Sequence, residues 1–358
     1  MELNQLWFIL IAVLWIGYLI LEGFDLGVGM LLKILPKGDA SQKEKERRVM
    51  INTIGPVWDG NEVWLLTAGG ATFAAFPEWY ATLFSGFYLP LFLILLALIW
   101  RGVSFEYRGK VSTKRWTNIW DWGITVGSWL PSILWGVAFA NLVRGVQLDS
   151  GHQFTGGFFS LLTPFALLGG LCLLSLLLLH GSVFLALKTD GQIRGNANKL
   201  ASRLAIVAIV LAGAWAIWAQ LAYGKGWTWI AVVLAAGGLV GVFFMNAQKR
   251  EGYAFILSAV VLVAAVVLIF GSMYPNVMPA HDAANSLTIT NASSSNYTLT
   301  VMTWVAVIMV PIVLAYSAWS YWVFRRRIST AHIPLATGLT LQKFRAAAFG
   351  GTAPGGAK

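Results

Sequence analysis

Carboxylates lie inside two stretches of the sequence that are otherwise apolar. Glu22 and Asp25 are three residues apart in the first stretch, and Asp59 and Glu62 have the same spacing in the second. In a helix this spacing places both acids of a pair on one face. Ionised groups are costly inside a bilayer, so acids at such positions commonly mark proton or ion pathways. The four acids are therefore candidates for a proton route.

The second acid pair belongs to a distinctive motif, Trp58-Asp-Gly-Asn-Glu-Val-Trp64. Asn61 lies between the two carboxylates, and Trp58 and Trp64 stand beside them. We predict that these three side chains give polar and aromatic support to the acids. Arg101, in a later apolar stretch, is a candidate partner for the charges.

A fifth acid, Asp121, lies in the sequence Trp120-Asp-Trp-Gly123. At about 1.5 Å per helical residue, Asp25 lies roughly 12 Å inward from the nearest basic residue that ends its stretch. The same count gives roughly 16 Å for Asp59 and roughly 9 Å for Asp121. All five acids are thus expected in the cytoplasmic half of a membrane or near its midplane.

Two interpretations of the five acids remain open. Desolvation and mutual repulsion oppose the ionisation of several acids together, so some should be protonated or share protons. One interpretation is a proton route from the cytoplasm toward an interior site. The other interpretation is a polar network, or ion pairs with Arg101 or Arg108, that fixes the packing of the helices. The residues alone do not decide between the two.

The composition identifies the setting of these acids. Of the 358 residues, 58% are hydrophobic and 11% are charged, and the mean hydropathy is +0.70. A soluble domain carries far more charge, so we predict an all-α polytopic membrane protein. Apolar stretches of about 20 residues or more predict nine membrane-spanning helices, at 6–32, 51–75, 79–100, 118–142, 158–187, 203–223, 227–247, 253–273 and 299–324.

The basic residues predict how the chain is oriented in the bilayer. If alternate loops share one side, all but two of the 25 Lys and Arg residues fall on that side, and only Arg144 and Lys225 fall opposite. The positive-inside rule then places the amino terminus outside and the carboxyl terminus in the cytoplasm. The net charge of +10 thus reflects membrane topology and does not indicate nucleic-acid binding. We divide the chain into a transmembrane domain, 1–327, and a flexible cytoplasmic tail, 328–358.

Histidine and cysteine offer little for a metal centre. Only His180, of four histidines, lies in a predicted span, and Cys172 is the single cysteine. A haem in a membrane protein usually needs imidazole ligands, and His180 has no second intramembrane histidine to pair with. We therefore expect no metal site in this chain, and expect His180 to make a polar contact near the cytoplasmic rim.

Taken together, the motifs resemble those of a known family, subunit II of the cytochrome bd quinol oxidases. The resemblance covers residues 5–330, and its details are closer to the versions of actinobacteria and other Gram-positive bacteria. The motifs that carry it are Gly23-Phe-Asp-Leu-Gly-Val-Gly-Met30, Pro56-Val-Trp-Asp-Gly-Asn-Glu-Val-Trp64, Phe84-Ser-Gly-Phe-Tyr-Leu-Pro90, Arg101-Gly-Val-Ser-Phe-Glu-Tyr-Arg108, Trp120-Asp-Trp-Gly123, Gly136-Val-Ala-Phe-Ala140 and Met302-Thr-Trp304.

The resemblance implies a respiratory complex in the bacterial cytoplasmic membrane. In this family subunit II pairs with subunit I, which binds two b-type haems and one d-type haem, and a small accessory subunit is possible. The complex oxidises quinol and reduces oxygen to water. Some members hold a structural quinone in subunit II. The resemblance also implies a proton path in which Asp59 is the best-supported residue of this subunit, and in which Asp25 and Asp121 match further acidic positions.

An alternative from another class is a proton-coupled secondary transporter. Membrane-buried acids and glycine-rich helices suit that function as well. Many such transporters contain an inverted repeat and short, interrupted helix pairs, and the sequence shows neither. The oxidase subunit is therefore the favoured prediction.

Overall fold

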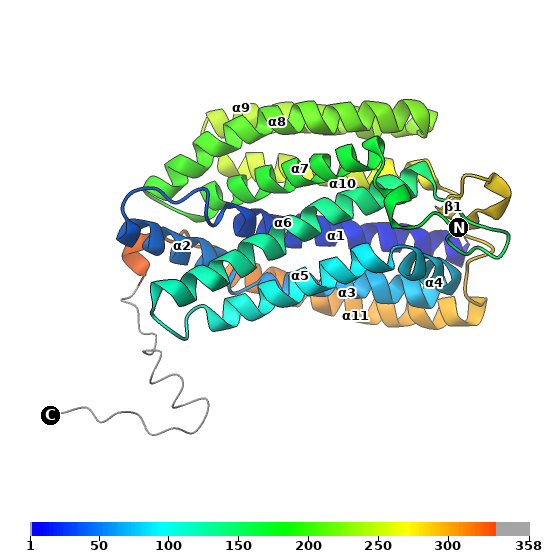
Figure 1. Cartoon of the computed structure of the whole chain (residues 1–358), viewed down its shortest axis with the longest axis horizontal. Coiled ribbons are helices and arrows are strands. Elements are labelled where there is room, and N and C mark those ends of the chain that lie inside the picture. Colours follow the sequence, from blue (N-terminus) through cyan, green and yellow to red (C-terminus); the bar gives the residue numbers. More distant parts are fainter. Residues whose placement is uncertain (1, 334–358) are drawn as a thin grey trace, which may run out of the picture.

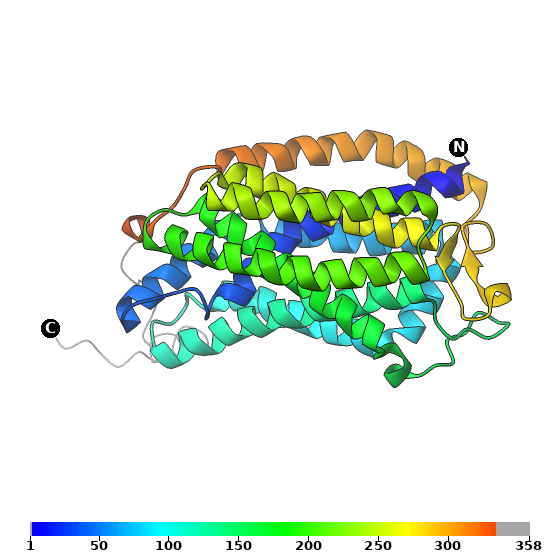
Figure 2. The same cartoon turned by 90° about the horizontal axis from the view of Figure 1, so that it is seen from above.

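The computed structural model describes residues 2–333 as a bundle of long helices that run along one common axis (Figures 1 and 2). The helices are α1 (Leu3–Leu31), α2 (Ala40–Ile54), α3 (Trp58–Ala75), α4 (Pro77–Gly86), α5 (Tyr88–Tyr107), α6 (Lys114–Arg144), α7 (Pro164–Lys188), α8 (Gln192–Ala222), α9 (Trp229–Ala247), α10 (Glu251–Met273) and α11 (Asn296–Val323). Short 3₁₀ turns precede α7 and α9 and follow α11, at Phe158–Leu161, Gly226–Thr228 and Thr330–His332.

The two ends of the bundle differ in structure. A small antiparallel hairpin, β1 (Asn276–Met278) with β2 (Leu287–Thr288), lies at one end together with α4. The polar helix α2 and the turn between α5 and α6 lie at the other end (Figure 1). We call this second end the basic end, because the basic segments 33–50, 101–117 and 188–202, which contain turns and the adjoining helix ends, converge there.

Eight helices in the described part of the chain are long and apolar enough to cross a membrane. They are α1 and α5–α11. The prediction of an all-α polytopic membrane protein is therefore confirmed. Helix α3 packs on α1 but is outside this set, because Asp59, Asn61 and Glu62 lower its mean hydropathy. A total of nine spans, and the orientation of the termini, stay predictions.

Two of the predicted spans are broken. The span expected at 51–75 is interrupted at residues 55–57, where α2 ends and α3 begins. Pro56 lacks the N–H that a continuous helix requires, and its ring obstructs the preceding turn. Likewise, the span expected at 79–100 is divided into α4 and α5, and Pro90 lies four residues after the end of α4 at Gly86. The acids near Asp59 thus lie at the start of a helix and not in the middle of one.

The tail predicted at 328–358 begins with ordered residues. Ile328 N–H donates to the Lys188 carbonyl (2.9 Å), and Asp190 N–H donates to the Ile328 carbonyl (3.1 Å). These bonds attach the chain after α11 to the end of α7. Residues 334–358, on which most of this prediction falls, lie outside the described residues.

The core of the bundle is formed where α1 meets α7. The apolar part of α7 is 89% buried within the chain, whereas that of α11 is 6% buried. Gly27 of α1 and Gly181 of α7 face each other, and a Cβ on Gly27 would lie 2.3 Å from the Leu177 carbonyl oxygen and 2.7 Å from Gly181 Cα. Glycine therefore permits the backbones to approach closely, as small residues commonly do in membrane helices.

We predict that Gly27→Ala destabilises the bundle, because the added methyl group must separate α1 from α7. Overpacking of this kind costs about 1–3 kcal/mol. The measurement is the midpoint of thermal unfolding of the protein purified in mild detergent. Gly237→Ala on α9 is the matched control, since a Cβ there meets no atom within 4 Å. Equal midpoints for the two variants would contradict the close approach.

Candidate functional site

An ion pair buried in the bundle connects α1 to α5. Glu22 of α1 and Arg101 of α5 are both fully buried, and an Arg101 guanidinium N–H donates to Glu22 Oε1. The Arg101 guanidinium also lies over the Phe105 ring, 5.2 Å from its centroid. Removal of one partner from such a buried ion pair strongly destabilises a protein, because the other charge is left buried and unpaired. The pair therefore fixes the position of both side chains.

Asp25 lies one helical turn from Glu22 and has different partners. Its Oδ2 accepts a hydrogen bond from Asn61 Nδ2 of α3 (2.6 Å), and Asn61 Oδ1 accepts one from the Tyr321 hydroxyl of α11 (2.6 Å). Asp25 is fully buried. Three helices thus converge on this carboxylate. Asn61, a residue that the sequence singled out, thus contacts the acid directly.

Tyr321 was missed by the sequence analysis. A tyrosine near the end of an apolar helix is typical of the aromatic belt at a membrane surface. No pattern in the sequence separates Tyr321 from the other aromatic residues of α11. Its contact with Asn61 joins positions 260 residues apart, so only the fold could reveal it.

Asp59 and Glu62 occupy the first turns of α3 and are less buried than the α1 acids. Asp59 is exposed on the surface of the chain, and its Oδ1 accepts a hydrogen bond from the Gly60 N–H (2.8 Å). Glu62 is half-buried. The acids therefore form a gradient from the exposed Asp59, through Glu62, to the buried Asp25 and Glu22. The charge of Arg101 acts on Glu22, Asp25 and Glu62. Asp59 interacts with Asp25 and Glu62.

Two tryptophans of the α3 motif hold this helix against its neighbours. The Trp64 ring packs directly over Gly17 of α1, where a Cβ would lie 2.1 Å from the ring. The Trp58 ring packs against Phe105 of α5, with 4.9 Å between the ring centroids. The aromatic support predicted for both residues is thus contact between helices, made on either side of the acids.

We call Glu22, Asp25, Asp59, Glu62 and Arg101, with the residues that contact them, the acid cluster. Several buried polar atoms of this cluster have no hydrogen-bond partner within residues 2–333. They are Tyr18 Oη, Glu22 Oε2, Asp25 Oδ1, Arg101 Nε and Arg101 Nη2. Buried polar groups are normally bonded to protein or to ordered water. These atoms therefore provide positions at which water molecules could bind between the carboxylates.

Asp121 belongs to a separate network at the basic end. Its Oδ1 accepts a hydrogen bond from Arg108 Nε (2.6 Å), and its Oδ2 lies 3.5 Å from Arg47. Arg108 also donates to both carboxylate oxygens of Glu44, at 3.0 Å each. Burial alone would lower the pKa of Arg108, but the carboxylates of Asp121 and Glu44 raise it above its ordinary value. Asp121 thus joins α2, α5 and α6, and no ion pair or hydrogen bond connects it to the other four acids in the described structure.

His180 is held by two hydrogen bonds in the interior of the bundle. Its Nδ1 lies 2.7 Å from Ser258 Oγ, its Nε2 lies 3.0 Å from the Ile20 carbonyl, and its ring stacks on Phe255. Because both ring nitrogens are engaged within the protein, His180 does not fit the role of a haem ligand. No group of three or more His, Cys, Asp or Glu side chains suited to a metal ion occurs within the described residues.

The comparison with protein families decides the identity of the chain. Residues 3–324 match the family described as cytochrome bd terminal oxidase subunit II. The chain belongs to this family. The match includes all eleven helices, from the start of α1 at Leu3 to the end of α11 at Val323. Every residue of the acid cluster therefore lies inside it.

Curated relatives in the bd oxidase subunit II family agree with this assignment. The chain is 41% identical to cytochrome bd ubiquinol oxidase subunit 2 of Bacillus subtilis, over 92% of this chain and 97% of that protein. It is 39% identical to cytochrome bd-I ubiquinol oxidase subunit 2 of Escherichia coli K12, over 92% of this chain and 96% of that protein. The resemblance inferred from the motifs is confirmed, and the Bacillus relative fits the likeness to Gram-positive versions.

The fold has a counterpart among solved structures. A chain in the structure of bd oxidase from Geobacillus thermodenitrificans superposes with a TM-score of 0.74, over 90% of this chain and 99% of that one. At 16% identity this comparison shows a shared fold and nothing finer. Membership in the bd oxidase family makes the chain a subunit of an oxidoreductase complex and does not favour the alternative of a secondary transporter.

We predict that Arg101→Met destabilises the protein by about 3–5 kcal/mol, because it leaves Glu22 buried without its partner. The double variant Arg101→Met with Glu22→Gln should recover part of this loss, since the unpaired charge is then removed. The measurement is the midpoint of thermal unfolding in detergent. Arg203→Met, at an exposed position of α8, is the control. A double variant no more stable than Arg101→Met would refute the ion-pair explanation.

Proposed function

We propose that this chain is the second subunit of a membrane-bound quinol oxidase and supplies part of a proton path through Asp59 and Asp25. Membership in the bd oxidase subunit II family and the ubiquinol oxidase names of its relatives support the assignment. The complex oxidises quinol, reduces oxygen to water, and resides in the cytoplasmic membrane of a bacterium. The chain pairs with subunit I and stabilises it.

The haems of the complex belong to subunit I in this proposal. When bound there, they carry electrons from quinol and reduce oxygen. His180, the histidine inside the bundle, does not fit as a haem ligand, because both of its ring nitrogens are engaged in hydrogen bonds. What this chain contributes is a set of carboxylates, which hold and transfer protons.

The observation that carries the proton path is the burial gradient of the acids. Asp59 is exposed on the surface of the chain, Glu62 is half-buried, and Asp25 and Glu22 are fully buried. Reduction of oxygen to water consumes protons, and a carboxyl group can accept and release a proton where an amide cannot. Protons would pass from Asp59 through Glu62 to Asp25, with water at the buried polar atoms that lack protein partners.

Other residues of the cluster have positioning roles in this proposal. Asn61 holds Asp25 in one rotamer, and Tyr321 fixes the orientation of the Asn61 amide. Arg101 offsets the negative charge of Glu22 and its neighbours. We assign Asp121 to helix packing, because Arg108 and Arg47 occupy its carboxylate oxygens.

We also propose that α3 is a ninth span, and that the basic end faces the cytoplasm with the amino terminus outside. Helix α3 contains 18 residues and would be about 27 Å long, close to the thickness of the bilayer core. It runs alongside α1 from the end that carries α2 to the end that carries α4 (Figure 1). The basic loops at the end with α2 match the positive-inside rule.

Asp59→Asn should slow oxygen consumption with quinol on the order of 100-fold, the lower range of the loss when a positioned proton-transfer group is removed. The haems should remain assembled, because the exposed Asp59 side chain supports no contact between helices. The measurements are oxygen uptake across pH and a reduced-minus-oxidised spectrum of the purified complex.

Asp190→Asn is the matched control for this variant, since it makes the same change at an exposed site of the basic end. Normal turnover of Asp59→Asn at every pH with full haem content would end the proton-path proposal. Loss of haem would favour a role in assembly. The oxidase assignment itself fails if the unaltered chain purifies without a partner subunit and the preparation shows no absorption of d-type haem.

Labelling from outside the cell tests the orientation and the ninth span. In a Cys172→Ala background, we expect a membrane-impermeant maleimide to label Glu78→Cys at the start of α4 in intact cells. Ser41→Cys on α2 should react only after the membrane is permeabilised. Both positions are exposed, and α3 lies between them. Labelling of both positions from the same side would show that α3 does not cross the membrane.

A further inference from the structure

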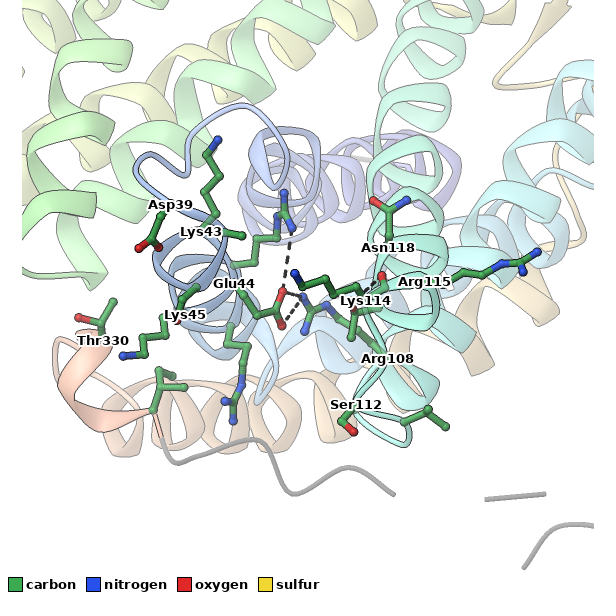
Figure 3. A pocket seen from close by; sticks show the side chains of 18 residues that line it. Asp39, Lys43, Glu44, Lys45, Arg108, Ser112, Lys114, Arg115, Asn118 and Thr330 are labelled. Atoms are coloured by element: carbon green, nitrogen blue, oxygen red, sulfur yellow. Dashed lines mark hydrogen bonds and ion pairs between the residues drawn. The ribbon is translucent and has the colours of Figure 1, made fainter. Parts of the chain in front are cut away.

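A cleft of about 1370 Å³ opens at the basic end, between α2, the turn that joins α5 to α6, and the 3₁₀ turn Thr330–His332. Figure 3 shows side chains of α2 and of the start of α6 on opposite sides of it, with Glu44 and Arg108 bonded between them. Seven basic side chains and two acidic ones line the cleft, namely Lys43, Lys45, Arg47, Arg48, Arg108, Lys114, Arg115, Asp39 and Glu44. The cleft is therefore suited to an anion.

The positive charge of the cleft is only partly neutralised by the protein. Arg47 and Arg108 form ion pairs with Glu44 and Asp121. In the described residues no ion pair to an acid involves Lys43, Lys114 or Arg115. Ser112, Thr117 and Asn118 add hydroxyl and amide groups to the lining. Cations placed among hydrogen-bond donors match the oxygen atoms of a phosphate group.

Aromatic residues beside the cleft indicate its depth in the membrane. Trp120 packs between Tyr107 and Trp116, with 5.6 Å between ring centroids in each pair. Lys33 Nζ lies 4.3 Å from the centre of the Trp122 ring on the same helix as Trp120. Tryptophan and tyrosine gather where lipid headgroups meet the acyl chains. The cleft thus opens at the level of the headgroups.

An apolar surface continues from the cleft toward the middle of the bundle. On the outer faces of α5 and α6, the side chains that are exposed include Trp100, Val103, Ile119, Trp122 and Val126. Each of these residues has between 37% and 49% of its surface exposed. Together with the tryptophans at its edge, this apolar surface is suited to acyl chains. A molecule with a phosphate in the cleft and hydrocarbon on this surface would satisfy both features.

We propose that the basic cleft binds the headgroup of an anionic phospholipid, with its acyl chains along the outer face of α5 and α6. The phosphate binds in the cleft that Lys43 of α2 and Lys114 and Arg115 of α6 help to line. It adds to the link that Glu44, Arg108 and Asp121 already make between these helices. The cytoplasmic leaflet carries the negative lipids that such basic clusters attract. This site is separate from the acid cluster and from the proton path.

The test uses the intact complex in mild detergent and titrates it with fluorescent phosphatidylglycerol in mixed micelles. The altered protein carries Lys43→Gln, Lys114→Gln and Arg115→Gln. Each basic residue near an anionic headgroup contributes on the order of fivefold in affinity, so we expect about 100-fold weaker binding. Lys199→Gln, Lys249→Gln and Arg203→Gln form the control, which removes the same charges from exposed positions outside the cleft.

Retention of tight binding by the control and its loss in the cleft variant would support the site. Equal loss in both would show a general surface charge effect and overturn the proposal. Phosphatidylcholine that binds as tightly as phosphatidylglycerol would also overturn it. Competition by inorganic phosphate as effective as competition by unlabelled phosphatidylglycerol would assign the cleft to a soluble phosphate compound instead. Thermal unfolding of the cleft variant shows that the bundle is intact.

Discussion

The acid cluster depends on the position of one cation. Arg101 is fully buried and forms an ion pair with Glu22, while its charge also acts on Asp25 and Glu62. Desolvation of these groups is expensive, and attraction between opposite charges offsets it only with good geometry. Without Arg101, three buried or half-buried carboxylates would lie together in an apolar bundle. Arg101 therefore makes carboxylates tolerable in the interior of the bundle. Its ion pair with Glu22 also connects α5 to α1, the helix that the other helices of the site contact.

The chain separates its charged side chains into two networks with different physical roles. At the basic end, Asp121 and Glu44 are matched by Arg108 and Arg47, so the acids are held by ion pairs. In the interior, Arg101 faces several carboxylates, and polar atoms of Glu22, Asp25 and Tyr18 remain without partners in the described structure. Each of these two acids at the basic end thus has a basic partner. The interior cluster has more acids than cations, and this excess of carboxylates is what the proposed proton path uses.

The sequence was sufficient for the class of fold and for the family. Long apolar stretches predicted the helices, and the spacing of Glu22 with Asp25 and of Asp59 with Glu62 predicted the two helices that carry the cluster. The break at Pro56 was not predicted, although a proline inside a predicted helix commonly ends or kinks it. Nor did the sequence predict the bond from Tyr321 to Asn61, since that contact joins distant segments. The roles of the acids depend on contacts of this second kind.

The exposure of Asp59 has a consequence for the assembly. Its carboxylate lies on the surface of a helix whose neighbours Val63 and Leu66 are 50% and 71% exposed, and α11 beside α3 is mostly exposed as well. A carboxylate that faced lipid at this position would be costly. It is tolerable if water or a second protein covers it, and large apolar surfaces next to it suit a second protein. The exposure of Asp59 beside these apolar side chains therefore favours a contact with another subunit at this face, which is where the proposed proton path would begin.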